Sequence, residues 1–387
     1  MSGGPRILLV ARRFWPTISD VTQRLLDTAL QLQRMGASIE VLTSQGHVSW
    51  PKKIECFEIP IHRVDVAPVN PLRAIRYQRS LLAWIEKHAH RFQGFYFDAP
   101  DIEVAPILKS RGQMENCATC VRFDPLELQE ASGEAWHPLP QAIDVCRRAR
   151  VVITPRASAH QALVAKGIRA NTIARVSDAI ITLVPRQSEF RTNAKRILGE
   201  INHEFFLRAK DRMILCPGEI SRKWNPELLV RAIGPLAEGD RSLHTWIVGE
   251  GGDRMRLYEL LRQFGWHHLI TLPGVFTNLD EIFGVADLCV FPSENVGLSY
   301  TLARAVLSGI PVLCAGKEPA RWLDPKVCSN SYFLPRKADT LRAAIRAWLD
   351  NPEPFVRNSI VAKEHLQAML VNEKSAAQAI MESLGSR

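Results

Sequence analysis

The sequence predicts an α/β protein made of two doubly wound, Rossmann-like domains that face each other across a cleft. Short apolar runs alternate with amphipathic helical patterns in both halves of the chain. The length of 387 residues suits two to three domains, and 46% hydrophobic with 23% charged residues indicates a globular rather than a disordered or fibrous chain. Because doubly wound sheets bind ligands at the carboxyl ends of their strands, we expect the substrate between the domains.

The first domain is expected over residues 1–187 and opens with a strand, a helix and a second strand. The first strand is the apolar run 6–11, the helix is 21–35 and ends at Gly36, and the second strand is 38–43. The alternation continues with strands at 94–97, 117–123, 151–154 and 173–176 and helices at 141–148 and 158–166. This order predicts a parallel sheet with helical crossovers.

The second domain is expected over residues 205–365, after a polar helical stretch at 189–210. Its predicted strands are 213–216, 244–248, 269–272, 288–291, 311–314 and 331–334. Its predicted helices are 226–236, 254–264, 279–285, 300–307 and 340–349. Residues 366–387 are expected as a C-terminal helix, and its return to the first domain is a hypothesis.

Charge and cysteine usage narrow the class of protein. The net charge of +9 favours anionic partners, such as phosphorylated small molecules, acidic membranes or nucleic acid. No apolar run is long enough to span a membrane, and the first residues lack the pattern of a secretory signal, so we expect a cytoplasmic protein. The eight cysteines are expected as reduced, mostly buried thiols, and the one CxxC, Cys117 to Cys120, as strand packing rather than a metal site.

Three loops that follow strands in the second half could bind an anion. In the first, Gly218 lets the backbone approach a ligand, Arg222 and Lys223 add positive charge, and a helix N-terminus follows. A solvated basic turn explains this first loop equally well. The second loop, 246–252, is rich in glycine but lacks the GxGxxG spacing, and in the third loop Gly297 frees the backbone before a helix. These loops are the candidate ligand site.

Short motifs surround the third loop. They are Phe-Pro-Ser at 291–293, Gly-Leu at 297–298, Ala305, Ser-Gly-Ile-Pro-Val at 308–312, Ile-Val-Gly-Glu-Gly at 247–251, Leu-Pro-Gly-Val at 272–275, Ala-Asp at 286–287 and Leu-Arg-Ala-Ala-Ile-Arg-Ala-Trp-Leu-Asp-Asn-Pro at 341–352. In the first half, Phe-Trp-Pro at 14–16 and Val-Leu-Thr at 41–43 agree with them. Together these segments resemble the family 4 glycosyltransferases, strongly over 213–350 and weakly between about 50 and 140.

The resemblance implies the GT-B fold and transfer of a sugar from a nucleotide-sugar donor to a saccharide or lipid-linked acceptor in envelope or polysaccharide assembly. It also implies retention of configuration, with the nucleotide-sugar as substrate and without a metal or other cofactor. The donor-binding candidates that it implies are Gly218, Glu219, Arg222, Lys223, Gly249, Glu250, Glu294, Val296, Gly297, Leu298, Ser299 and Arg304. The acceptor-side candidates are Ser19, Asp20, Arg122 and Asp124.

Six positions and one segment depart from the family's pattern. Val296 and Arg304 replace its Glu-x7-Glu pair, Glu219 and Trp224 replace an arginine and a lysine of the diphosphate loop, Ser19 and Asp20 replace paired glycines, and the segment Arg122 to Asp124 lacks the expected histidine. Glu294 is the nearest substitute carboxylate and the candidate catalytic residue. Two functions therefore stay open: a divergent transferase, or a catalytically inactive GT-B-like protein that acts as a binding or scaffold partner of an active one. An unrelated enzyme of the same architecture, such as a sugar epimerase, is a third class.

Residues 71–92 predict a single amphipathic helix. Its apolar arc is Ala74, Ile75, Leu81, Leu82 and Ile85, and its basic arc is Arg73, Arg76, Arg79, Lys87 and Arg91. Such a helix can lie on an anionic surface, which would place the protein at the inner face of the membrane. The alternative is a helix packed on the sheet with a solvated charged face. Nucleic acid is not expected as a partner, because no aromatic residues are interleaved with the basic ones.

Overall fold

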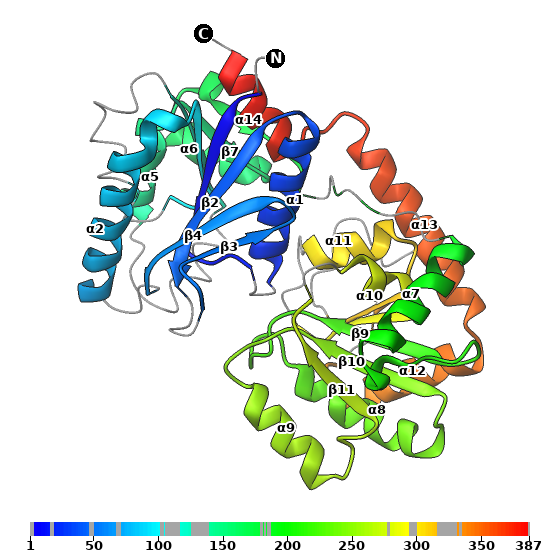
Figure 1. Cartoon of the computed structure of the whole chain (residues 1–387). Helices are drawn as coiled ribbons and strands as arrows, with labels where there is room; N and C mark the ends of the chain where they lie inside the picture. Colours follow the sequence, from blue (N-terminus) through cyan, green and yellow to red (C-terminus); the bar gives the residue numbers. More distant parts are fainter. Residues whose placement is uncertain are drawn as a thin grey trace. The chain divides into compact units, whose positions relative to one another are not determined.

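A computed structural model describes residues 4–15, 19–45, 50–66, 71–100, 104, 117–124, 139–178, 181, 183, 187–276, 279–293, 300–315, 331–332 and 335–385. The chain forms two compact units, each built around its own sheet (Figure 1). The first unit contains residues 1–14, 24–180 and 372–387, and the second contains 15–23 and 181–371.

The first sheet has the strand order β3-β4-β2-β1-β5-β6-β7-β8. Its strands are β1 (Arg6–Ala11), β2 (Ser38–Gln45), β3 (Lys53–Cys56), β4 (Ile59–Val66), β5 (Gly94–Phe97), β6 (Ala118–Arg122), β7 (Val151–Thr154) and β8 (Ile173–Arg175). Every pair is parallel except β3 with β4. The predicted strands are confirmed, but the hairpin of β3 and β4 was not predicted. The charged residues Lys53 and Glu55 interrupt the apolar sequence of β3, as is typical of an edge strand, so β3 contains no apolar run that would predict it.

Helices cover both faces of this sheet. They are α1 (Asp20–Arg34), α2 (Pro71–His88), α5 (Leu139–Arg148), α6 (Ala157–Ala165) and α14 (Ala376–Gly385), with short turns η1 (Ala89–Arg91) and η3 (Ala170–Thr172). Tyr77, Leu81 and Ile85 of α2 share a core with Leu8 and Val10 of β1. Figure 1 shows α1 and α14 on the face opposite to α2.

The second sheet has the order β11-β10-β9-β12-β13 and is parallel throughout. Its strands are β9 (Arg212–Pro217), β10 (Leu243–Val248), β11 (Ile270–Gly274), β12 (Leu288–Phe291) and β13 (Val312–Cys314). Its helices are α7 (Ser188–Ile201), α8 (Pro226–Gly239), α9 (Arg254–Gln263), α10 (Asp280–Val285), α11 (Tyr300–Leu307), α12 (Ala338–Asp350) and α13 (Glu353–Leu370), with the turn η4 (His203–Phe205). Apolar residues of α8, α9 and α12 form one core with the strands, and α7, α10 and α11 cover the other face (Figure 1).

Two predicted elements near the C-terminus are described only in part or differ from the structure. Residues 333 and 334 of the strand predicted over 331–334 lie outside the described residues, and Tyr332 makes an isolated parallel bridge to Cys314. The segment 366–387, expected as one helix, is the end of α13, a break, and α14, which packs against β5, β6 and β7. The break contains Asn372 to Ser375, whose polar side chains interrupt the apolar pattern.

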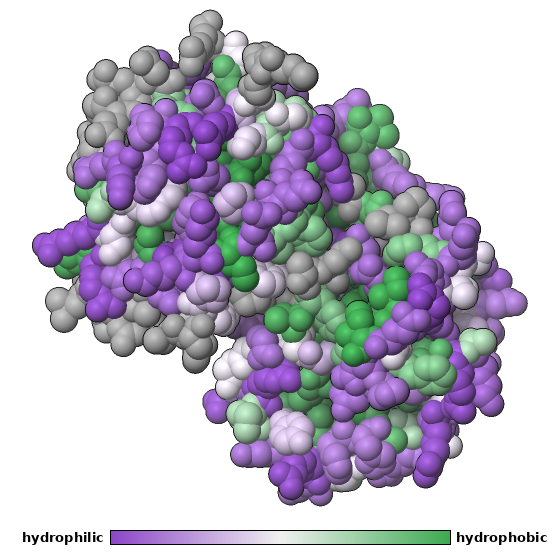
Figure 2. Space-filling model, in the orientation of Figure 1, coloured by the Kyte–Doolittle hydropathy of each residue, from purple (hydrophilic) through white to green (hydrophobic). Residues whose placement is uncertain are grey.

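The surface in Figure 2 is largely hydrophilic, and its larger apolar patches lie over the second unit. Within the described parts of the chain, no helix is both long enough and apolar enough to cross a membrane.

Candidate functional site

The sheet order locates the expected ligand edge of the second unit. The chain runs from β9 outward through β10 to β11 and then returns to place β12 on the other side of β9. This reversal lies between β9 and β12, and doubly wound sheets bind ligands at the carboxyl ends of the strands beside such a reversal. The loops after β9 and β12 therefore frame the candidate donor site.

Trp224 lies at this reversal. Its indole ring covers Gly218, where a Cβ atom would come within 2.3 Å of the ring nitrogen. The ring also meets Phe291, the last residue of β12, edge to face at 6.2 Å between centroids. Burial raises the pKa of the neighbouring Cys216 thiol to about 12, and contact with Trp224 opposes that rise. An aromatic side chain thus stands where the family places a lysine.

The other donor candidates of the first loop point toward solvent. Glu219 is exposed, as are Arg222 and Lys223, and Arg222 reaches only to 4.0 Å from Asp253. The loop therefore offers two cations to a ligand, and Glu219 does not cover the strand ends.

The glycine-rich second loop joins the first loop directly. Gly218 and Ile220 donate backbone N–H groups to Val248 and Glu250 at 3.0 Å, so the pairing of β9 with β10 continues past the strand ends. A Cβ atom on Gly249 would lie 1.8 Å from the carbonyl oxygen of Gly218. The Glu250 side chain forms an ion pair with Arg254 at 3.2 Å. Gly249 therefore serves close packing between two loops.

The third loop ends in α11, whose first turn is capped from a distant part of the chain. Asp20, which groups with the second unit, accepts hydrogen bonds from the backbone N–H of Thr301 at 3.0 Å and from its hydroxyl. The neighbouring Ser19 bonds to Thr22. Five candidates, Glu294, Val296, Gly297, Leu298 and Ser299, lie outside the described residues. A carboxylate thus already occupies the positive end of this helix.

Arg304 is buried on α11 with 8% of its surface exposed. It forms an ion pair with Asp280, and its guanidinium lies over the ring of Phe283 at 5.5 Å. Its charge is thus neutralised within the second unit.

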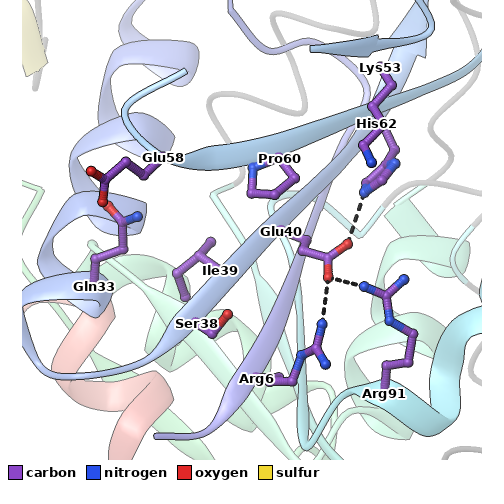
Figure 3. Close-up of a pocket in the computed structure, with 10 residues that line it drawn as sticks. All are labelled: Arg6, Gln33, Ser38, Ile39, Glu40, Lys53, Glu58, Pro60, His62 and Arg91. Carbon is purple, nitrogen blue, oxygen red and sulfur yellow. Dashed lines mark hydrogen bonds and ion pairs between the residues drawn. The ribbon is translucent and has the colours of Figure 1, made fainter. Parts of the chain in front are cut away.

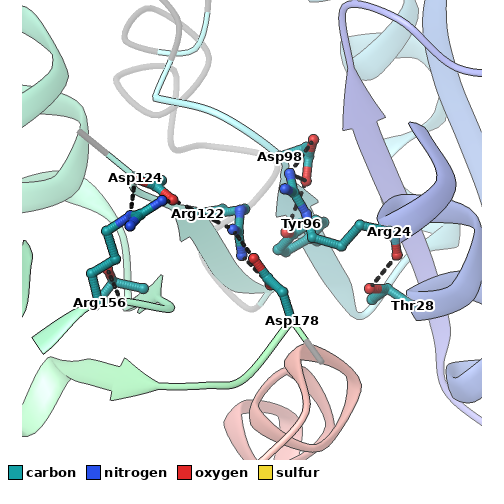
Figure 4. A network of polar contacts seen from close by, with 9 residues as sticks. Arg24, Thr28, Tyr96, Asp98, Arg122, Asp124, Arg156 and Asp178 are labelled. Atoms are coloured by element: carbon teal, nitrogen blue, oxygen red, sulfur yellow. Dashed lines mark hydrogen bonds and ion pairs between the residues drawn. The ribbon is translucent and has the colours of Figure 1, made fainter. Parts of the chain in front are cut away.

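In the first unit, the acceptor-side candidates belong to a network of buried ion pairs (Figure 4). Arg122, at the end of β6 and fully buried, makes two hydrogen bonds to Asp178 at 2.8 and 2.5 Å. Asp124 accepts from Arg156 at 2.8 Å and lies 4.0 Å from Arg122. The structure therefore brings both predicted residues together and adds two partners, Asp178 and Arg156, that no sequence motif indicates.

A second pair lies where the first sheet reverses, between β1 and β5. Asp98 follows β5 directly and accepts from Arg24 of α1 at 3.3 Å and from the hydroxyl of Tyr96 at 3.0 Å (Figure 4). Burial, together with the charge of Asp98, raises the pKa of Tyr96 well above its usual value, so this hydroxyl stays protonated and donates. Asp98 and Asp178 each come just after a strand, and that position is the signal that could have identified them.

The basic helix α2 is shorter than predicted, and some of its predicted basic residues form ion pairs while others are exposed. It ends at His88, and Arg91 belongs to η1, where it bonds to Glu40 at 2.5 Å. Arg76 bonds to Asp65 at 2.8 and 2.6 Å. Ile75, expected on the apolar arc, is 47% exposed, because the buried stripe runs instead through residues 77, 81, 85 and 89. Arg79 and Lys87 are exposed, and the side chain of Arg73 lies outside the described residues.

The two cysteines of the CxxC segment point to different partners. The Cys117 thiol donates to the carbonyl of Phe92 at 3.2 Å, and Cys120 lies 3.2 Å from the hydroxyl of Ser383. Burial raises the pKa of Cys120 to about 11. All seven cysteines in the described part of the chain are free thiols.

Comparisons with known proteins agree with this architecture. Residues 211–351 match the family described as Glycosyl transferases group 1. The GtfA subunit of the UDP-N-acetylglucosamine–peptide N-acetylglucosaminyltransferase of Streptococcus parasanguinis is 34% identical over 108 residues, which are 27% of this chain. The chain spans about a fifth of the length of that relative, 21%.

Solved structures match nearly the whole chain. HepE of Anabaena, in complex with UDP and glucose, is similar with a TM-score of 0.65 at 16% identity, over 99% of this chain and 100% of HepE. The UDP-GlcNAc 2-epimerase of Neisseria meningitidis, bound to UDP-GlcNAc, is similar with a TM-score of 0.61 at 12% identity, over 99% and 100% of the two chains. At these identities the likeness shows the fold. The chain has the GT-B fold, and its residues 211–351 are similar to the group 1 glycosyltransferases.

Proposed function

We propose that this protein is a divergent glycosyltransferase that moves a sugar from a nucleotide-sugar donor to a saccharide or lipid-linked acceptor. The observation that carries the proposal is the family match over 211–351, which spans every strand of the second sheet. The name of the GtfA relative refers to UDP-N-acetylglucosamine, and the solved structures of HepE and the epimerase contain UDP and UDP-GlcNAc, so a UDP-sugar is the first donor to test.

The chemistry sets a requirement for the donor edge. Transfer breaks the bond between the anomeric carbon and a diphosphate oxygen, the acceptor oxygen bonds to that carbon, and the acceptor hydroxyl loses its proton. Negative charge grows on the leaving diphosphate and needs nearby positive charge. Arg222 and Lys223 are exposed on the loop after β9 and can supply it.

Two observations favour the second candidate, a catalytically inactive scaffold partner of an active transferase. The indole of Trp224 covers Gly218 at the point of strand reversal, where a diphosphate would need the backbone. The carboxylate of Asp20 takes the backbone N–H of Thr301 at the start of α11. Both features fill positions that an anionic donor would use.

Thermal unfolding of the purified protein with UDP, UDP-glucose and UDP-GlcNAc at millimolar concentration separates the two candidates. A ligand present at 100 times its dissociation constant stabilises the folded state by about 2.7 kcal/mol. A clear rise in the unfolding temperature with one UDP-sugar, followed by acceptor-dependent release of UDP, supports the transferase. Cooperative unfolding without any shift supports the scaffold, whose partner is then sought by co-purification.

Peripheral attachment at the inner face of the membrane is the part of the proposal that concerns location. Arg76, Arg79 and Lys87 of α2 are exposed, and Arg76 is paired with Asp65. Arg79 and Lys87 can each contribute on the order of 1 kcal/mol near an anionic surface. Flotation with phosphatidylglycerol vesicles at low salt is the test. Binding that weakens in an Arg79→Ala/Lys87→Ala variant supports attachment, whereas no flotation of the natural protein removes it.

A further inference from the structure

A pocket of about 330 Å³ opens at the amino ends of the strands in the first unit (Figure 3). Its lining includes Arg6, which begins β1, Ser38, which begins β2, and Arg91, which precedes β5. β1 is six residues long, so this pocket lies about 20 Å along the strand from the carboxyl edge, where the ion pairs of Figure 4 lie. The two sites of the first unit are therefore separate.

Glu40 organises the basic side chains of the pocket. It is buried, and its Oε1 accepts from Arg6 at 3.1 Å and from Arg91 at 2.5 Å, while its Oε2 lies 2.8 Å from Nε2 of His62. Figure 3 shows the two guanidinium groups converging on this carboxylate from different elements, with Lys53 above His62. The carboxylate thus fixes two arginines that belong to β1 and η1.

The fixed arginines keep most of their donors available. Each guanidinium has five N–H groups, and one nitrogen of each contacts Glu40. The side chains of Arg6 and Arg91 are 44% and 32% exposed, so a ligand can reach them. Within the described chain, the Lys53 ammonium has no hydrogen-bond or ion-pair partner. At this end of the pocket three permanent cations face one carboxylate, and Glu58 lies at the other end beside Gln33 (Figure 3).

We propose that this pocket binds a phosphate group, held by Arg6, Arg91 and Lys53. At the Glu40 end of the pocket, the three cations exceed the one carboxylate by two charges, which matches a phosphate dianion. Arginine side chains bind phosphate oxygens through paired hydrogen bonds. The pocket is larger than a single phosphate, so the group is carried on a larger molecule, either a soluble phosphate ester or a lipid headgroup. Because the pocket lies away from the carboxyl edge of its own sheet, its ligand is distinct from the sugar acceptor.

The first test is calorimetric titration of the full chain with inorganic phosphate at low ionic strength. Lys53→Ala is compared with Lys52→Ala, which removes the neighbouring exposed lysine that does not line the pocket. We expect phosphate to bind the natural protein and Lys52→Ala equally, and to bind Lys53→Ala five- to tenfold more weakly. Unfolding temperatures without phosphate should be the same in all three, because neither lysine is buried. Absence of phosphate binding, or an equal loss in both variants, overturns the proposal.

A second measurement identifies the source of the phosphate. Flotation with phosphatidylcholine vesicles that contain phosphatidic acid is compared with flotation with phosphatidylcholine alone. Binding that requires phosphatidic acid, depends on Lys53 and is reversed by inorganic phosphate indicates a lipid headgroup. Calorimetric binding without such flotation indicates a soluble phosphate ester. Neither measurement involves a nucleotide-sugar, so its failure is distinguishable from failure of the proposed transferase activity.

Discussion

The two units fill the ligand edge of their sheets with different kinds of side chain. In the first unit, the buried pair Arg24 and Asp98 lies where the strand order reverses. In the second, the corresponding point is filled by the indole of Trp224 against Phe291. Both lie at the carboxyl ends of parallel strands, where doubly wound proteins place their ligands. The same fold can therefore close its ligand edge with paired charges or with an aromatic ring.

This difference has consequences for stability. A buried ion pair is weak net stabilisation, but removing one partner leaves an uncompensated buried charge. Packing of an aromatic ring on a glycine depends on complementary shape, so this contact tolerates a change of chemical group but not added volume. Substitutions in the first unit should therefore destabilise the protein by leaving a buried charge without its partner, whereas substitutions in the second unit should destabilise it by adding volume.

The largest effect is expected from Arg122→Leu in the first unit. The change leaves Asp178 and Asp124 without their shared cation in a site where Arg122 is fully buried, and should lower the free energy of unfolding by about 3 kcal/mol. Urea unfolding at neutral pH measures it. The control is Arg175→Leu, which removes a 54% exposed arginine from an ion pair with Glu373 and should cost under about 1 kcal/mol. Equal losses in the two variants would contradict the importance of burial.

The next effect is expected in the second unit from Gly249→Ala. The added Cβ would lie 1.8 Å from the Gly218 carbonyl oxygen, at a residue with φ of 152°, and should lower stability by about 2 kcal/mol. Gly252→Ala is the matched control, because nothing lies within 4 Å of its Cβ position. If both alanines are tolerated equally in urea unfolding, the two loops do not need close packing.

A smaller effect is expected from Trp224→Lys, which removes the ring from Gly218 and places a cation at the strand ends. It should strengthen UDP binding about tenfold, which corresponds to about 1.4 kcal/mol. Calorimetric titration with UDP is the measurement, and Trp224→Phe, which keeps an aromatic ring, should leave the affinity unchanged. Unchanged affinity in the lysine variant would place the nucleotide away from this point of reversal.

The smallest effect concerns pH and the polar groups of the first unit. Burial lowers the pKa of His62, with Lys53 and Arg91 acting in the same direction, and the carboxylate of Glu40 only partly offsets this. The unfolded chain therefore takes up a proton near pH 6.5 before the folded chain does, so stability falls as the pH drops below that value toward the lowered pKa. His62→Gln, whose amide can still donate to Glu40, should flatten this decline in unfolding temperature measured between pH 7 and 5. An unchanged slope would assign the decline to other groups.

The second unit should respond in a different pH range. The Ser242 hydroxyl and backbone N–H lower the pKa of Asp240 below its ordinary value of 3.8. The resulting stabilisation is present above pH 3.8 and is lost as the pH falls through the lowered pKa. Asp240→Asn should therefore lower the unfolding temperature by a constant amount between pH 7 and 5, and its difference from the natural protein should shrink as the pH falls below 3.8.

The sequence alone determined the alternation of elements, the two-unit architecture and the family resemblance. β1, β5, β7, β12 and α11 begin and end at the predicted residues, because apolar periodicity is encoded in neighbouring positions. The motifs between 213 and 350 lie within the segment that the group 1 family matches. The glycines and prolines of these motifs set the conformation of the local backbone, so the spacing of the motifs can be recognised from the sequence.

Only the tertiary structure decided which charges meet and which positions are covered. Arg122 and Asp178 are 56 positions apart and pair because β6, β7 and β8 lie side by side in the sheet. The same holds for Glu40 with Arg91, 51 positions apart, and for Asp20 with Thr301, 281 positions apart. Strand order, rather than local pattern, sets these partners, and Coulomb attraction is strong only between groups that folding has brought close and shielded from water.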